Sequence, residues 1–212
     1  MRFLFALVPL LVSPSLPAAD GYGMTFGDNT NASTGDGVVF VTCHGQPRTA
    51  SGSCNAYTGD TACSTRLPVL CLDVDGRERP AGLLVPPQGG GVMPAPFYAG
   101  WAAGRVAATK PIAGVDLTGP SAADAICRTQ FGKGWRMAEF HDGLIDDAGN
   151  RGGWAWYAHG TLDTTTRYWV WINDTQANCW NGTGQQIEAA PRVSGSGGVK
   201  RSTQKIARDR DE

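Results

Sequence analysis

The segment "GWRMAEFHDG" at 134–143 brings together residues that could do chemistry: Glu139, His141 and Asp142 lie within four positions. An imidazole beside carboxylates is suited to general acid–base catalysis, and the same residue types bind transition metals. Whether the three side chains act together depends on the secondary structure that positions them. We therefore ask first which element this segment forms.

A helix starting at Met137 would place a stripe of apolar and ring-bearing residues on one face, at positions i, i+3, i+4 and i+7. Those residues are Met137, Phe140, His141 and Leu144. In that helix the histidine faces the core, the two acids face elsewhere, and the three side chains do not converge. The H-E-x-x-H spacing of helical metal sites is also absent. We expect a packed histidine here and no metal site.

Enzyme motifs do not appear elsewhere in the chain. There is no G-x-S-x-G nucleophile motif, no phosphate-binding P-loop, and no cysteine that the covalent framework leaves for nucleophilic work. A hydrolase using Glu139, His141 and Asp142, or His159, stays an alternative that rests on residue types alone. We expect no cofactor.

The N-terminus has the pattern of a secretory signal peptide. Arg2 precedes an apolar run over 3–12 that is too short to span a bilayer, and small residues follow at 15–19. The sequence predicts cleavage after about residue 19 and a secreted or periplasmic protein. No later stretch is long and apolar enough for a transmembrane helix, so we expect no transmembrane segment.

Six cysteines in an exported chain predict disulfides. Four lie close together, at Cys43, Cys54, Cys63 and Cys71, whereas Cys127 and Cys179 stand far apart. The simplest partition pairs Cys127 with Cys179 and leaves three possible pairings among the other four. A zinc site is disfavoured, because the spacings contain no C-x₂-C pair.

Composition divides the mature chain. Strands expected at 37–43 and 67–74 should pair within a disulfide-rich β unit over 20–76. Proline and glycine crowd 77–96, which indicates a linker, and 183–212 has the composition of a disordered tail. The formal net charge is −1, so nothing predicts a basic face for nucleic acid.

The region from 97 to 182 should form the main domain, because all seven tryptophans lie in it. We expect a strand, turn and strand over 104–117. A helix should begin near Ser121, capped by Ser121 and Asp124, and end at Gly132 or Gly134. Its expected face is Ala122, Ala125, Ile126 and Thr129. Alternating aromatic residues predict strands at 152–160 and 167–174.

A cysteine-bearing helix, a second short helix, a tryptophan-rich sheet and a late cysteine together resemble the C-type-lectin-like fold. The string "ADAICRTQFGKGWRMAEF" is most similar to bacterial exported variants of this fold. The pattern "GKGWRMAEFHDG … WVWINDTQANCW" resembles a set of exported bacterial proteins of uncharacterised role. The resemblance covers 97–182. It implies an α+β domain with two short helices on a small, mainly antiparallel sheet.

C-type lectins that bind sugars hold Ca²⁺ with a Glu-Pro-Asn or Gln-Pro-Asp loop and a Trp-Asn-Asp strand. This chain has "WIND" at 171–174 and neither loop motif, and one Asn and one Asp supply too few oxygens for Ca²⁺. We expect no lectin-type calcium site.

Exposed indole rings are good platforms for sugars. Trp154 and Trp180 lie near expected strand ends, and with Asn173 and Asp174 they are the candidate ligand-binding residues. We expect an exported binding or interaction module for a glycan or a surface protein. A structural component of an envelope or matrix is the alternative.

Overall fold

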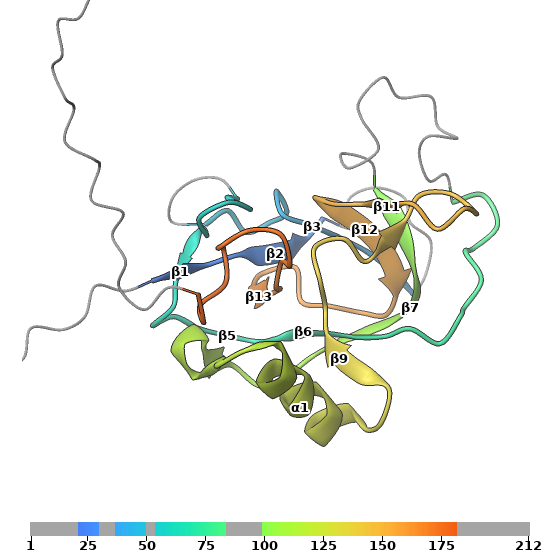
Figure 1. Ribbon diagram of the computed structural model, residues 1–212. Helices are drawn as coiled ribbons and strands as arrows, with labels where there is room; N and C mark the ends of the chain where they lie inside the picture. Colours follow the sequence, from blue (N-terminus) through green and yellow to red (C-terminus); the bar gives the residue numbers. More distant parts are fainter. Residues whose placement is uncertain (1–20, 30–36, 50–53, 84–98, 182–212) are drawn as a thin grey trace, which may run out of the picture.

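The computed structural model describes residues 21–29, 37–49, 54–83 and 99–181, and these form a mixed α+β fold that is mainly sheet with one helix (Figure 1). The expected signal peptide at 1–19, most of the 77–96 linker and the tail at 183–212 lie outside the described residues. No helix within the described ranges is long and apolar enough to cross a membrane.

A curled nine-stranded sheet makes up most of this fold (Figure 1). Its main path runs β11-β10-β7-β12-β3-β2-β13, and β6 pairs with both β7 and β9. All pairs are antiparallel except β12 with β7. The strands are β2 (Thr25–Asp28), β3 (Val38–Thr42), β6 (Leu70–Asp73), β7 (Gly100–Ala108), β9 (Trp135–Met137), β10 (Gly143–Leu144), β11 (Arg151–Gly152), β12 (Ala155–His159) and β13 (Arg167–Trp169).

Strands from before residue 77 and from after residue 97 pair with each other in this sheet. The expected strands at 37–43 and 67–74 are confirmed as β3 and β6, but the prediction that they pair with each other is wrong. β3 lies between β2 and β12, and β6 lies between β7 and β9. The segment 20–76, expected to form a unit of its own, therefore shares one sheet with the segment after 97.

Two small sheets and the helix complete the described fold. β1 (Tyr22–Gly23) pairs with β4 (Thr61–Ala62), and β5 (Arg66–Leu67) pairs with β8 (Ile112–Ala113). A 3₁₀ turn, η2 (Gly114–Asp116), then leads to α1 (Pro120–Phe131). The expected strand, turn and strand over 104–117 thus become the end of β7, then β8 and η2.

Helix α1 begins without the expected capping box. Its N-cap is Gly119, and Pro120 occupies the first turn, where its missing N–H costs nothing. Asp124 instead accepts a hydrogen bond of 2.9 Å from the backbone N–H of Met137, which fastens β9 to the helix. The buried residues are Ala123 and Cys127, so the expected apolar face is displaced by one position.

The second helix, expected over 137–144, does not form. Residues 135–137 are β9, residues 139–142 form a turn, and β10 follows. The backbone bonds here are long-range: β9 pairs with β6, and Phe140 N–H donates to the Trp171 carbonyl at 2.9 Å. Apolar residues spaced for a helix also fit a strand and a turn when neighbouring strands supply the hydrogen bonds.

The core forms two main clusters. The larger packs Phe26, Leu70, Trp156 and Tyr168 between strands of the main sheet, and the smaller surrounds α1. On β12 the burial alternates, which confirms the period of two expected for 152–160. The strand expected at 167–174 is shorter: β13 ends at Trp169, and all three of its residues are buried.

All six cysteines form disulfides, as the sequence predicts, but the predicted partition is wrong. The bonds are Cys43–Cys54, Cys63–Cys179 and Cys71–Cys127. Cys71 lies on β6, which β9 connects to α1, so its partner is the helix cysteine. Two of the three disulfides therefore join the first half of the chain to the second.

Candidate functional site

The turn between β9 and β10 brings Glu139 and His141 into direct contact. His141 Nδ1 lies 3.0 Å from Glu139 Oε1, and the backbone N–H of His141 donates to Glu139 Oε2 at 2.6 Å. Glu139 is buried, while the His141 side chain keeps 23% of its surface exposed. This reverses the expectation of a buried histidine and outward-facing acids, because a turn lets side chains two positions apart meet.

Asp142 does not join that pair but fixes the turn that holds it. Its carboxylate forms a bidentate ion pair with Arg136 at 2.5 and 3.0 Å, and it accepts the Glu139 backbone N–H at 2.6 Å. Burial raises the pKa of Asp142, and the hydrogen bonds and charge of Arg136 oppose that rise. We assign Asp142 a structural role.

The loop after β13 adds two of the predicted site residues to the pair. Asn173 donates its backbone N–H to Glu139 Oε1 at 3.3 Å. Asp174, which is exposed, places Oδ2 3.8 Å from His141 Nε2. The hydrogen bond to Glu139 raises the pKa of His141; burial opposes it, and nearby carboxylates raise it further. The imidazole thus lies between two acids and favours its charged form.

Trp154 lies on the other side of the Phe140 ring from His141. Its ring lies 5.4 Å from that of Phe140, and the Phe140 ring lies 4.8 Å from His141. Trp154 also stacks on His44 at 5.4 Å, with 5° between the planes, and meets Tyr57 edge-on at 6.2 Å. Buried Phe140 therefore separates the indole from the imidazole.

Tyr57 is the residue that sequence reasoning missed, and it is 63% exposed. The Asn55 side chain accepts hydrogen bonds from the Tyr57 and Thr58 backbone N–H groups, a turn that holds the ring outward. Thr175 donates to the Ala56 carbonyl at 2.6 Å, which places the loop of Asp174 beside this turn. The sequence signal that could have identified Tyr57 is an aromatic residue within the turn segment "CNAYTG".

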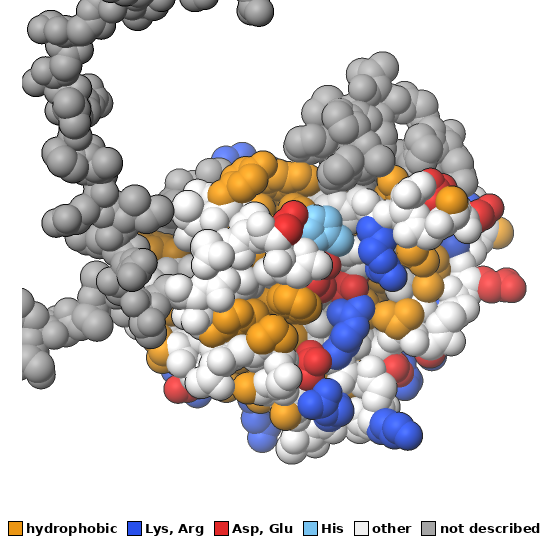
Figure 2. Space-filling model, viewed as in Figure 1, with side chains coloured by type: hydrophobic (Ala, Val, Ile, Leu, Met, Phe, Trp, Pro, Cys, Tyr) orange, Lys and Arg blue, Asp and Glu red, His pale blue; other side chains and the backbone are white. Residues whose placement is uncertain are grey.

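We call the surface formed by Tyr57, His141, Trp154, Asn173 and Asp174 the aromatic–acidic face. Figure 2 shows a face of the molecule on which a histidine lies among acidic, basic and hydrophobic side chains. Aromatic rings beside hydrogen-bonding groups suit a ligand with both apolar and hydroxyl-bearing surfaces.

Two other predicted site residues, Trp180 and His159, lie away from the aromatic–acidic face. Trp180 packs with Trp171, their rings 6.4 Å apart, against the core cluster around α1. His159 meets the edge of Trp101 at 5.2 Å, in a third, small cluster. Neither has a described contact with the aromatic–acidic face, so the hydrolase set that included His159 is not assembled. Within the described residues, no group of three or more His, Cys, Asp or Glu could hold a metal ion.

Comparison with known proteins finds no family model, no curated protein and no solved structure that matches this chain. What defines the protein is therefore its own geometry: an α+β fold that three disulfides cross-link. Three disulfides indicate folding outside the reducing cytoplasm.

Proposed function

We propose that this chain is an exported, disulfide-stabilised binding module that recognises a glycan through the aromatic–acidic face. One observation carries the proposal: an exposed tyrosine and a partly exposed tryptophan share a surface with His141, Asn173 and Asp174. Segments from three distant parts of the chain supply these groups, so the fold itself assembles the surface.

The chemistry of each group suits a sugar. The C–H face of a pyranose stacks on indole and phenol rings, and carboxylate, amide and imidazole groups bind hydroxyls. Trp154 supports this role because its backbone has a φ of 72°, which bulky residues seldom adopt. Strain of this kind concentrates at ligand-binding positions.

The resemblance to C-type-lectin-like domains favours the same function and stays a proposal. It rests on the strings "ADAICRTQFGKGWRMAEF" and "WIND", which lie in α1, β9 and the loop that carries Asn173 and Asp174. Recognition in this chain would use no calcium, since the aromatic rings and a single acidic loop provide the contacts.

Glycan-array binding of the disulfide-bonded chain, followed by calorimetry, tests the proposal. Tyr57→Ala and Trp154→Ala should each weaken binding roughly thirtyfold, the effect of removing an aromatic anchor. Tyr22→Ala is the matched control, because Tyr22 is also an exposed tyrosine (52%) but lies on β1. Absence of any glycan ligand, or equal binding by Tyr57→Ala and Tyr22→Ala, would overturn the proposal.

A hydrolase is the second candidate, and the contact between Glu139 and His141 is the observation that favours it. A carboxylate that orients an imidazole recurs in catalytic sites. With an acid on each side, the imidazole would act as a general acid. His141→Gln should then abolish turnover of a bound glycan, a loss far larger than the weaker binding that calorimetry records for the same variant. Turnover that survives in His141→Gln excludes this role.

A further inference from the structure

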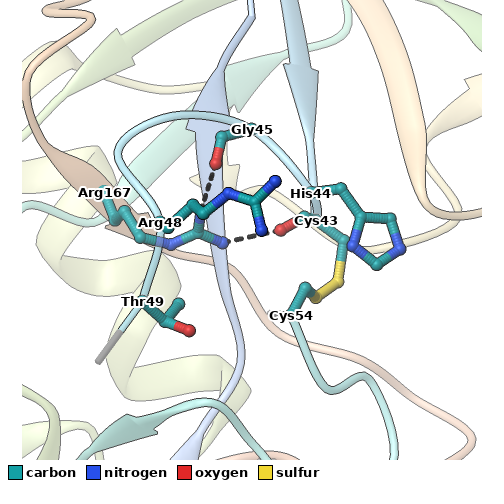
Figure 3. A pocket seen from close by; sticks show the side chains of 7 residues that line it. All are labelled: Cys43, His44, Gly45, Arg48, Thr49, Cys54 and Arg167. Atoms are coloured by element: carbon teal, nitrogen blue, oxygen red, sulfur yellow. Dashed lines mark hydrogen bonds between the residues drawn. A yellow bond between two sulfur atoms is a disulfide. The ribbon is translucent and has the colours of Figure 1, made fainter. Parts of the chain in front are cut away.

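A pocket of about 240 Å³ lies beside the aromatic–acidic face and is lined by three basic side chains, those of His44, Arg48 and Arg167. Figure 3 shows its seven lining residues, which are Cys43, His44, Gly45, Arg48, Thr49, Cys54 and Arg167. None of the seven is acidic. A pocket lined by charge of one sign attracts ions of the other sign.

The guanidinium of Arg167 gives the pocket a fixed positive charge. Arg167 is 5% exposed, and its N–H groups donate to the Thr25 hydroxyl and to the carbonyls of Thr25, Cys43, Gly45 and Pro47, at 2.5 to 3.1 Å. All five acceptors are uncharged. Burial lowers the pKa of Arg167, but a guanidinium stays protonated at neutral pH.

The charge of Asp60 acts on Arg167, but Asp60 is not among the residues that line this pocket. Asp60 accepts hydrogen bonds from the backbone N–H and hydroxyl of Thr25 and from the Thr61 hydroxyl. Thr25 therefore stands between the Asp60 carboxylate and Arg167. Asp60 lines a neighbouring pocket of about 590 Å³ that Arg48 and Arg167 also reach, and it is not among the residues around the smaller pocket.

Arg48 brings a second guanidinium to the same pocket. Figure 3 shows the Arg48 and Arg167 side chains extending the same way, toward Cys43 and His44. Arg48 is exposed, whereas Arg167 is buried. Both guanidinium charges attract an anion to this pocket.

We propose that this pocket binds one oxyanion, the carboxylate or sulfate group of a ligand. Arg48 donates a bidentate pair of hydrogen bonds to the anion, and Arg167 supplies an immobile positive field that costs no reorganisation. His44 joins this pocket to the aromatic–acidic face, because its ring stacks on Trp154. The anion pocket stands on its own charges and does not require that the face bind a glycan.

Titration of the disulfide-bonded chain with sodium sulfate, followed by two-dimensional ¹⁵N NMR, tests the site directly. Saturable shifts are expected for the backbone amides of 44–46, 48 and 49 and for the Arg48 side-chain Nε–H. Sodium chloride at matched ionic strength should give only small, linear shifts. A parallel titration with acetate identifies the group: the anion that saturates at lower concentration is the preferred one.

Arg48→Gln should weaken sulfate binding at least tenfold, the effect of losing a charge-assisted hydrogen bond. Arg48→Lys should bind with intermediate affinity, because an ammonium keeps the charge but not the bidentate geometry. Arg66→Gln is the matched control, since Arg66 is an exposed arginine that donates to the Pro111 carbonyl. Shifts that never saturate with either anion, or equal affinity in Arg48→Gln and the native chain, would overturn the proposal.

Discussion

Arg167 lies where β13, β2 and the loop after β3 meet, and its guanidinium holds these segments together through backbone carbonyls. A close approach of backbones belongs to the same arrangement: a Cβ added at Gly45 would lie 2.3 Å from the Gly27 carbonyl oxygen. Only residues without a Cβ allow the loop to come so near to β2. The loop that presents His44 and Arg48 is therefore positioned by one buried side chain and two glycines.

Replacing Arg167 by methionine should destabilise the fold by about 3–5 kcal/mol, because several buried carbonyls lose their donor at once. Chemical denaturation of the oxidised protein measures the change. Arg105→Met is the control: Arg105 is about half exposed and pairs with Asp73 at 3.0 Å, so its loss should cost about 1 kcal/mol or less. Equal effects of the two variants would show that the buried carbonyls find other partners.

His141 should make stability depend on pH in a defined direction. Its folded-state pKa is raised, so its contribution is complete below the unfolded value of about 6.5 and is lost as pH rises through the folded pKa. The native chain should therefore be more stable relative to His141→Gln at pH 6 than at pH 8.5. Paired thermal melts across this range measure the difference, and a difference independent of pH would contradict the assignment.

At the scale of elements, the disulfides differ in what they constrain. Cys63–Cys179 spans 116 residues and ties the loop after β4 to the segment after β13, whereas Cys43–Cys54 spans 11 residues. In the chain-entropy description, the disulfide that closes the longer loop stabilises the folded protein by about 5 kcal/mol. The disulfide that closes the shorter loop stabilises it by about 3 kcal/mol.

Serine substitution of both cysteines should therefore lower the unfolding free energy more for Cys63 and Cys179 than for Cys43 and Cys54. Guanidinium unfolding of the two double variants measures this under non-reducing conditions. A larger loss for the 11-residue loop would mean that local packing around Cys43 outweighs chain entropy.

Considered as a whole, the molecule unites two halves of the sequence in one sheet. β12 lies between β3 and β7, and β6 lies between β7 and β9, so neither half keeps a complete sheet without the other. Each half by itself would expose strand edges and the apolar face that the other half covers.

We expect one cooperative unfolding transition for the oxidised chain, with a calorimetric enthalpy close to the van't Hoff enthalpy. We also expect a fragment over 97–182 to stay unfolded, because β2, β3 and β6 are missing from it. Circular dichroism and amide exchange of that fragment provide the check. Two separate transitions, or a folded fragment, would support the predicted domain boundary at 77–96.

The local features of this protein can be predicted from the sequence alone. The β-branched run at 37–43 became β3, the alternation over 155–159 became β12, and the helix that carries Cys127 became α1. The signal-peptide pattern predicted that all six cysteines would be oxidised. Each of these follows from short-range periodicity or from the redox compartment, which no distant contact has to specify.

Long-range contacts in the folded chain establish which of these parts meet. Apolar spacing at 137–144 fits a helix or a turn equally well, and bonds from β6 and Trp171 chose the turn that joins Glu139 to His141. Cysteine pairing likewise follows from the sheet order and not from distance along the chain. Tyr57, Trp154 and Asp174 share one face because backbone hydrogen bonds and disulfides between distant segments bring them there, and no local pattern encodes such contacts.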